Sequence, residues 1–195
     1  GLGVSLVVMW AGVGIAKDTL EPLIGQAVDP KVYLQITNFV EKYDGVVGSH
    51  DLIVHNYGPA KSMASIHAEV PNNVDIEESH AVIDRIEREA MEKMGLFLVI
   101  HMDPVETEDK KVLAIKKDAE EIIKEMDKRV SIHDFRVVGG RDHKNLIFDM
   151  VIPYEYDKEK QNDLREEFAR RLREKNDRYH AVITMERSYV ASAAE

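Results

Sequence analysis

His50-Asp51 begins the stretch of sequence that decides the fold, residues 50–103. The stretch continues through Ile66-His67-Ala68, Ser79-His80 and Ile100-His101-Met102-Asp103. Each histidine lies at the edge of an apolar run, where a strand or a helix is expected. A neutral imidazole together with a carboxylate is a ligand set for zinc and the neighbouring divalent metals. The stretch therefore predicts secondary structure and a group of metal ligands at the same time.

Two of these segments are predicted to form a hairpin. The strand-like runs 47–57 and 60–70 flank Gly58-Pro59, which is a turn signal. Folding the chain antiparallel about this dipeptide places His50 opposite His67. Their Cβ atoms would then lie roughly 5 Å apart as direct cross-strand neighbours.

The other ligands come from the next two elements. His101 and Asp103 are two residues apart in a third strand and therefore share one face of the sheet. His80 lies near the start of a helical run. The competing interpretation is that each histidine is an exposed or hydrogen-bonded residue. The facing pair followed by His-x-Asp favours a metal site, and its candidate ligands are His50, His67, His80, His101 and Asp103.

Composition limits the kinds of partner. The chain has 195 residues and a net charge of −10, without a basic stripe, which argues against nucleic acid as a partner. The sequence contains no cysteine, so disulfides and thiolate metal sites are excluded.

Residues 1–16 carry no charged side chain and are strongly apolar. A complete membrane span needs about 20 such residues. We therefore interpret this run as the last part of a transmembrane helix whose beginning is missing, with Lys17-Asp18 marking the exit from the membrane. The alternative is a buried helix of a soluble protein.

A first α-β-β-α-β unit follows the connector 21–29. The predicted helices are 30–43 and 75–94, started by Asp29-Pro30 and Asp75, and the third strand is 96–102. Two helices can cover only one face of such a sheet. The open face is predicted to carry both the histidines and an apolar patch, which indicates a dimer contact. The residues of that patch are Leu52, Val54, Phe97 and Val99.

The same order of elements repeats in the second half. Predicted helices begin at Asp109 and Asp157, and predicted strands cover 146–152 and 179–186. Ser131-Ile132-His133-Asp134-Phe135 repeats the pattern of the first strand, with Gly139-Gly140 in place of the first turn. This indicates an α+β protein with two tandem copies of one domain. We predict three parts: residues 1–28 as membrane helix end and connector, 29–105 as the first copy and 106–195 as the second.

The second copy differs at the ligand positions. His50, His67, His80, His101 and Asp103 of the first copy correspond to His133, Asp149, Asn162, Thr184 and Glu186. Asn162 and Thr184 are poor zinc ligands, so at most three ligands remain. We therefore expect a structural second copy with a solvated surface at these positions, and a reduced metal site as the alternative.

Several motifs resemble one known family. They are Gly45-Val46-Val47-Gly48-Ser49-His50-Asp51-Leu52, Tyr57-Gly58-Pro59, Ile66-His67-Ala68-Glu69-Val70, Ser79-His80 and Ile100-His101-Met102-Asp103-Pro104. In this order, after an apolar helix and a connector, they look like the cytosolic end of cation diffusion facilitator transporters, especially bacterial zinc and iron efflux members. The resemblance covers residues 1–105.

The resemblance implies a membrane-embedded homodimer, in the cell membrane, that exchanges divalent cations for protons. The cytosolic domains would have a ferredoxin-like, metallochaperone-like fold and lie on the cytoplasmic side. The equivalents of His50, His67, His101 and Asp103 would bind a pair of zinc ions, with His80 assisting across the two-fold axis. The transport site itself lies in helices outside this chain.

The residues also support a pair of ions on chemical grounds. Four histidines and a carboxylate are too many ligands for one tetrahedral ion with an open position. Zinc is the expected ion, although imidazole ligands also suit iron, cobalt, manganese or cadmium. Asp51 and Glu69 are expected to be either outer-shell hydrogen-bond acceptors or solvated charges.

Two other functions remain open at this point. Paired metals can activate water, so a binuclear metallohydrolase is one alternative. The sequence shows no further catalytic cluster, and we predict that the chain is not an enzyme. The other alternative is a metal-free ferredoxin-like interaction module.

Overall fold

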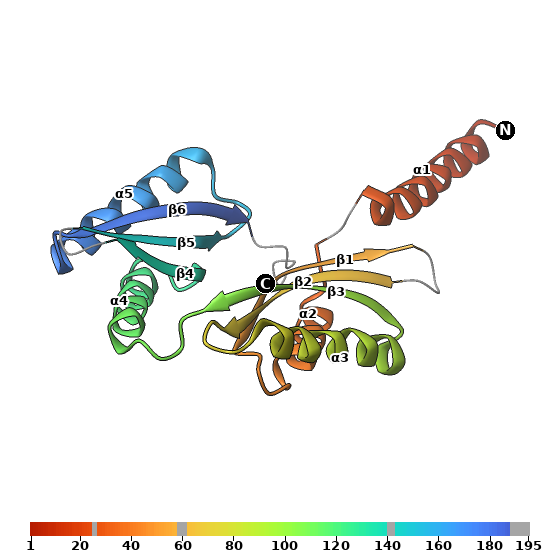
Figure 1. Cartoon of the computed structure of the whole chain (residues 1–195). Coiled ribbons are helices and arrows are strands. Elements are labelled where there is room, and N and C mark those ends of the chain that lie inside the picture. Colours follow the sequence, from red (N-terminus) through yellow and green to blue (C-terminus); the bar gives the residue numbers. More distant parts are fainter. Residues whose placement is uncertain (25–26, 58–61, 140–142, 188–195) are drawn as a thin grey trace.

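The computed structural model describes residues 1–24, 27–57, 62–139 and 143–187. An N-terminal helix, α1 (Leu2–Ile24), precedes two units that each contain two helices and three strands (Figure 1). The first unit contains α2 (Pro30–Glu41), β1 (Gly48–Asn56), β2 (Ser62–Pro71), α3 (Ile76–Met94) and β3 (Leu96–Val105). The second contains α4 (Lys110–Met126), β4 (Ser131–Gly139), β5 (Lys144–Ile152), α5 (Lys158–Lys175) and β6 (Tyr179–Arg187). The predicted α+β fold of two tandem α-β-β-α-β copies is confirmed.

The first sheet has the strand order β1-β2-β3. β1 is antiparallel to β2 and places His50 opposite His67, as predicted, while β2 is parallel to β3 and places His67 opposite His101. The turn predicted at Gly58-Pro59 lies outside the described residues. Three histidines on three adjacent strands thus form one row across the sheet.

Both helices of the first copy pack on the same face of this sheet. Their starts follow the sequence signals: the side chains of Asp29 and Asp75 accept hydrogen bonds from the first-turn N–H groups of Lys31 and Glu77. Gly95 ends α3 in the left-handed conformation, at φ +63°. Apolar side chains from α2, α3 and alternate strand positions make the core, including Val40, Ile66, Ile86 and Leu98.

A β-bulge changes the prediction for β1. The register with β2 shifts between His50 and Ile53, and Asp51 has the left-handed φ of +52°. The extra residue turns Leu52 into the core, where it is fully buried, and Val54 packs against the same core. The prediction that Leu52 and Val54 belong to the open face was therefore wrong, since strict alternation does not hold across a bulge.

On β3 the predicted alternation holds. Leu98 and Ile100 are buried in the core, whereas Phe97 and Val99 are 53% and 40% exposed. The open face of the first sheet therefore retains two of the four apolar residues predicted for it, next to His101.

The second copy repeats this architecture with the strand order β4-β5-β6. Its core includes Ile123 from α4 and Phe168 from α5, packed on Phe148 of the central strand. The bulge also recurs, since the register shifts between His133 and Arg136, and Asp134 has φ +50°. The second copy thus contains the same backbone distortion at the same His-Asp pair.

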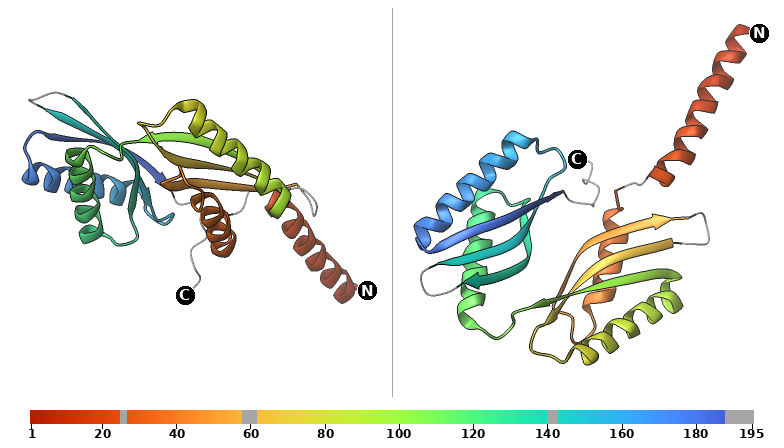
Figure 2. Two further views of the ribbon diagram at one scale, coloured as in Figure 1. Left: turned by 60° about the horizontal axis from the view of Figure 1, so that its bottom comes forward. Right: turned by 45° about the horizontal axis from the view of Figure 1, so that its top comes forward.

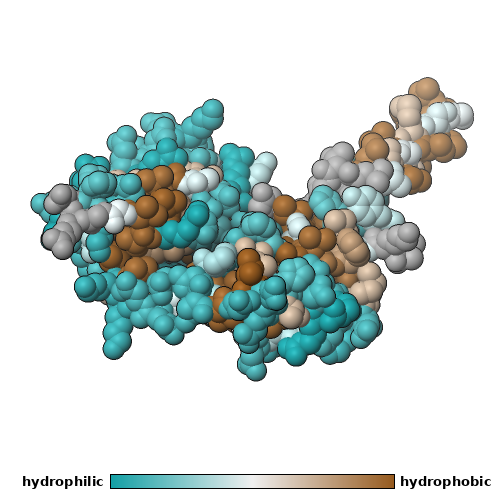
Figure 3. Space-filling model, in the orientation of Figure 1, coloured by the Kyte–Doolittle hydropathy of each residue, from teal (hydrophilic) through white to brown (hydrophobic). Residues whose placement is uncertain are grey.

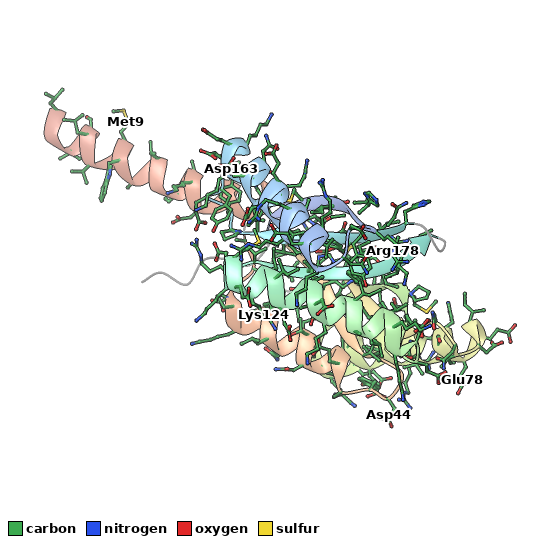
Figure 4. The ribbon with its side chains drawn as sticks, turned by 90° about the vertical axis from the view of Figure 1, so that its left-hand side faces the viewer. Met9, Asp44, Glu78, Lys124, Asp163 and Arg178 are labelled. Carbon is green, nitrogen blue, oxygen red and sulfur yellow. The ribbon has the colours of Figure 1, made fainter. Side chains whose placement is uncertain are left out.

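α1 projects away from both copies, and its residue Met9 points outward (Figures 2 and 4). Apolar side chains cover it (Figure 3), and none of the segment Leu2–Leu20 is buried within this chain. Within the described part of the chain, this is the helix long and apolar enough to cross a membrane. It continues to Ile24, past the predicted exit at Lys17-Asp18.

Candidate metal centre between the two copies

Three histidines converge on one carboxylate at the open face of the first sheet. Asp103 Oδ2 lies 2.8 Å from His67 Nδ1 and 3.3 Å from His50 Nε2, and Asp103 Oδ1 lies 3.3 Å from His101 Nε2. The row formed by strand register, with Asp103 two residues beyond His101, explains this convergence. Four of the five predicted ligands therefore come together as predicted.

His50 is the most buried of these ligands. Its Nδ1 atom lies 3.3 Å from Asp51 Oδ2, whereas its Nε2 atom is buried and its 3.3 Å contact with Asp103 Oδ2 does not have hydrogen-bond geometry. Burial lowers the pKa of His50, but the nearby carboxylates Asp103 and Asp51 outweigh burial and raise that pKa to about 9. In turn, burial raises the pKa of Asp103, and the imidazoles of His50 and His67 outweigh it, so the net shift is downward. The group is thus a strongly coupled set of anions and imidazoles.

Asp51 and Glu69 are not solvated charges. The Asp51 side chain is only 19% exposed, because the bulge turns it toward His50. Glu69 is buried as well. The sequence-based alternative of solvated surface is therefore wrong for both, and Asp51 contacts the ring of a candidate ligand.

The second copy contributes to the same region. His133 stacks on His50, with ring centroids 4.0 Å apart, and its Nε2 atom lies 3.6 Å from Asp51 Oδ1 and 3.6 Å from Glu186 Oε2. The expectation of a solvated surface is contradicted here too, because His133 is 8% exposed. Packing of one copy against the other causes this burial.

The ligand atoms fall into three overlapping groups, each small enough to surround one ion. They are His67, His101 and Asp103; His50, Asp51 and His67; and Asp51, His133 and Glu186. A cavity of about 320 Å³ is lined by members of all three groups, together with Asp149 from β5. The ligands thus form a continuous line from the first copy to the second.

Comparison with known proteins identifies the first copy. Residues 28–105 match the family model of the cation efflux protein, cytoplasmic domain. Residues 28–105 are a cation efflux cytoplasmic domain. The match includes every predicted ligand of the first copy and both helices that support its sheet.

Individual relatives of this cation efflux domain are distant. The cation-efflux pumps FieF of Yersinia enterocolitica and Salmonella typhimurium are each 26% identical over 104 residues, which cover 53% of this chain. The alignment covers 34% of each pump, so the chain spans about a third of the length of these curated relatives.

Solved structures give a similar result. A structure of the putative zinc transporter CzrB is 26% identical, with a TM-score of 0.37, over 40% of this chain and 98% of that chain. A mutant of the MamM-CTD is 19% identical, with a TM-score of 0.36, over 42% of this chain and 91% of that one.

The fifth predicted ligand of the cation efflux domain lies apart from the others. His80 is exposed near the start of α3 and belongs to none of the three groups. It was predicted to act across a two-fold axis, so its role stays a prediction.

Sequence reasoning missed that Asp51 faces both the cation efflux domain and the second copy. The signal was present in the repeated His-Asp pair, at 50–51 and at 133–134. Aspartate tolerates the left-handed conformation better than most residues, so this repeat could have indicated two bulges.

Proposed function

We propose that this chain is the cytosolic regulatory, metal-sensing and dimerisation region of a divalent cation efflux transporter of the zinc type. In the full-length protein, other membrane segments would exchange the cation for protons, and α1 would connect them to the cytoplasmic domain. We assign no catalytic reaction to the metal centre. Its role would be to sense the cytosolic cation.

One observation carries this proposal: the convergence of His50, His67 and His101 on Asp103. Imidazole nitrogens and a carboxylate are the donors that zinc takes, with bonds of about 2.0–2.2 Å. The buried Nε2 atom of His50, without a hydrogen-bond partner among the described residues, is the kind of group that a metal bond satisfies. The residues therefore fit a divalent transition metal, and iron, cobalt, manganese or cadmium would suit the same donors.

The first copy can hold two ions if a carboxylate bridges them. His67 belongs to the group with His101 and Asp103 and also to the group with His50 and Asp51. A neutral imidazole binds one ion, so His67 would serve one of the two positions, and Asp103 would bridge both. Its two oxygens face different histidines, which supports such a bridge.

The same face supports a homodimer. Phe97 and Val99 remain exposed beside the ligands, although the second copy packs near His50. Apolar residues left open on a sheet face are typical of a contact surface, and a two-fold axis would use the same patch twice. His80 of the partner subunit would then approach the metal centre, as the family resemblance implies.

Calorimetric titration of the chain with zinc tests this function. The His50→Ala/His67→Ala variant should bind zinc at least a hundredfold more weakly, because it loses ligands from both groups of the first copy. The matched control is His55→Ala/His180→Ala, which removes two exposed histidines on strands of the two copies. Unchanged zinc binding in the His50/His67 variant would contradict the proposal and favour a metal-free interaction module.

A further inference from the structure

We propose that the junction of the two copies holds a further metal position, formed by Asp51 from β1, His133 from β4 and Glu186 from β6. It would take a divalent transition-metal ion. This position goes beyond the metal centre of the cation efflux domain, because two of its three ligands come from the second copy.

The spacing of the three side chains is that of ligands around an ion. His133 Nε2 lies 3.6 Å from Asp51 Oδ1 and 3.6 Å from Glu186 Oε2. These separations are longer than N–H···O hydrogen bonds, which span about 2.7–3.2 Å. They are near the distance of about 3.3 Å between ligands of a tetrahedral ion with bonds of about 2.0 Å. His133 therefore bonds to neither carboxylate, and the ligand atoms of the three residues all lie within 4.8 Å of one another.

Burial gives a second, independent indication. The His133 side chain is 9% exposed, and both of its ring nitrogens are buried with no hydrogen-bond partner in the described structure. The Oε2 atom of Glu186 is buried and unpartnered in the same way. Buried polar groups that are left unsatisfied destabilise the folded protein. A metal ion bound to His133 Nε2 and Glu186 Oε2 would satisfy both.

The charges also favour a cation. Asp51 and Glu186 are two carboxylates beside one imidazole, with ligand atoms within 4.8 Å of one another, so that their negative charges repel. A divalent ion would cancel this repulsion and leave one neutral histidine as the third ligand. Three protein ligands with an open fourth position form a common zinc arrangement. Asp149, opposite His133 on β5, lines the adjoining cavity.

An ion in this position would join the two copies. Asp51 also contacts His50, so the junction position shares a residue with the metal centre of the first copy. Binding at the junction would fix the second copy against the face that carries the ligands. The second copy would then contribute directly to metal binding, rather than only to structure.

The test uses a background from which the main ligands of the first copy have been removed. In His67→Ala/His101→Ala, each of the two first-copy groups lacks at least one ligand, while the junction residues remain. We expect this protein to bind about one cobalt(II) ion, with the intense visible absorption of a tetrahedral site. Adding His133→Ala or the nearly isosteric Glu186→Gln should weaken cobalt binding at least tenfold. Adding His180→Ala, which removes an exposed histidine of β6, should leave it unchanged.

Thermal unfolding provides the control for folding. Cobalt should raise the unfolding temperature of the background protein and of its His180→Ala form, but not that of the Glu186→Gln form. Equal cobalt binding with and without the His133 and Glu186 substitutions would overturn the proposal, as would a background protein that binds no cobalt. Failure of the function proposed above would be visible separately, as wild-type affinity in the His50/His67 variant.

Discussion

His50 and His133 stack with their ring centroids 4.0 Å apart and their planes inclined by 25°. These residues occupy equivalent positions, since each precedes the left-handed residue of a bulge in the first strand of its sheet. Contact between equivalent residues is the mark of a two-fold relationship. The two copies of this chain therefore contact each other through one pair of equivalent residues.

This contact explains why the second copy adds residues to the ligand row of the first copy and does not form a second row of histidines. The second copy keeps an imidazole at this contact but has Asp149 and Thr184 where the first has His67 and His101. Its acidic residues thus face the histidine-rich end of the first copy across a shared cavity. The imidazoles come mostly from one copy, and the second adds carboxylates.

The first prediction concerns the bulge. Asp134 holds φ +50° and donates no ligand to the three groups, while it pairs with the exposed Arg136. A β-branched residue in the left-handed conformation is disfavoured by about 1–2 kcal/mol. Asp134→Val should therefore lower the free energy of unfolding by about that amount relative to Asp134→Gly, measured by urea denaturation. Equal stability of the valine and glycine variants would show that the backbone strain is absent.

The second prediction concerns protons. Metal binding requires a neutral imidazole, and the pKa of His50 is raised to about 9 by its carboxylate neighbours in the metal-free protein. At pH 8 zinc must therefore displace a proton from His50, and apparent affinity should rise with pH up to about 9. The zinc-binding enthalpies measured in Tris and in phosphate should differ by the difference between the ionisation enthalpies of the two buffers, for about one proton released on binding. His50→Ala should remove that difference. The same enthalpy in both buffers for the wild-type chain would contradict this.

The third prediction concerns the dimer. Val99 and Val182 are equivalent positions on β3 and β6, and they are 40% and 49% exposed. Val99→Asp should give monomers by light scattering in the presence of zinc, because it places a charge in the proposed contact. Val182→Asp is the matched control and should leave the dimer intact. If both variants form dimers, the contact lies elsewhere. If the wild-type chain is a monomer at high concentration, the proposed contact does not exist.

Much of the fold could be predicted because the periodicities are local. Aspartate N-caps, apolar stripes and the left-handed glycine after α3 determine the helices, and the facing of His50 and His67 follows from the spacing of two strands. The burial of Leu52 could not be derived from alternation, because the bulge adds one residue to β1. One extra residue distorts the backbone only locally, but it moves every later side chain of the strand to the other face of the sheet.

The junction could not be predicted for a different reason. His133 looks like a surface residue in a copy that has lost most of its ligands. Its burial depends on contact with His50 and Asp51, which precede it by more than 80 residues. Periodicity within one domain contains no information on such packing between domains. The ligands of the first copy were predictable because neighbouring strands bring them together.

The fourth prediction concerns sensing. Metal can favour a closed dimer only by its difference in affinity for the closed and open states, and a nearly complete shift needs about 10⁴-fold. The chain has no cysteine, so Arg173→Cys on α5 can carry a single spin label in each protomer. Zinc should shorten and narrow the distance distribution between the two labels. His80→Ala should reduce this change; an identical distribution with and without saturating zinc would mean that metal does not switch the dimer.

The central claim is that the histidine row of the first copy binds metal, and anomalous diffraction at the zinc absorption edge tests it most directly. Crystals of the chain grown with zinc should show a strong anomalous peak within bonding distance of His67, His101 and Asp103. A second peak is expected beside His50. A zinc-containing crystal with anomalous peaks only at exposed histidines such as His55 or His180, and none at Asp103, would contradict the account.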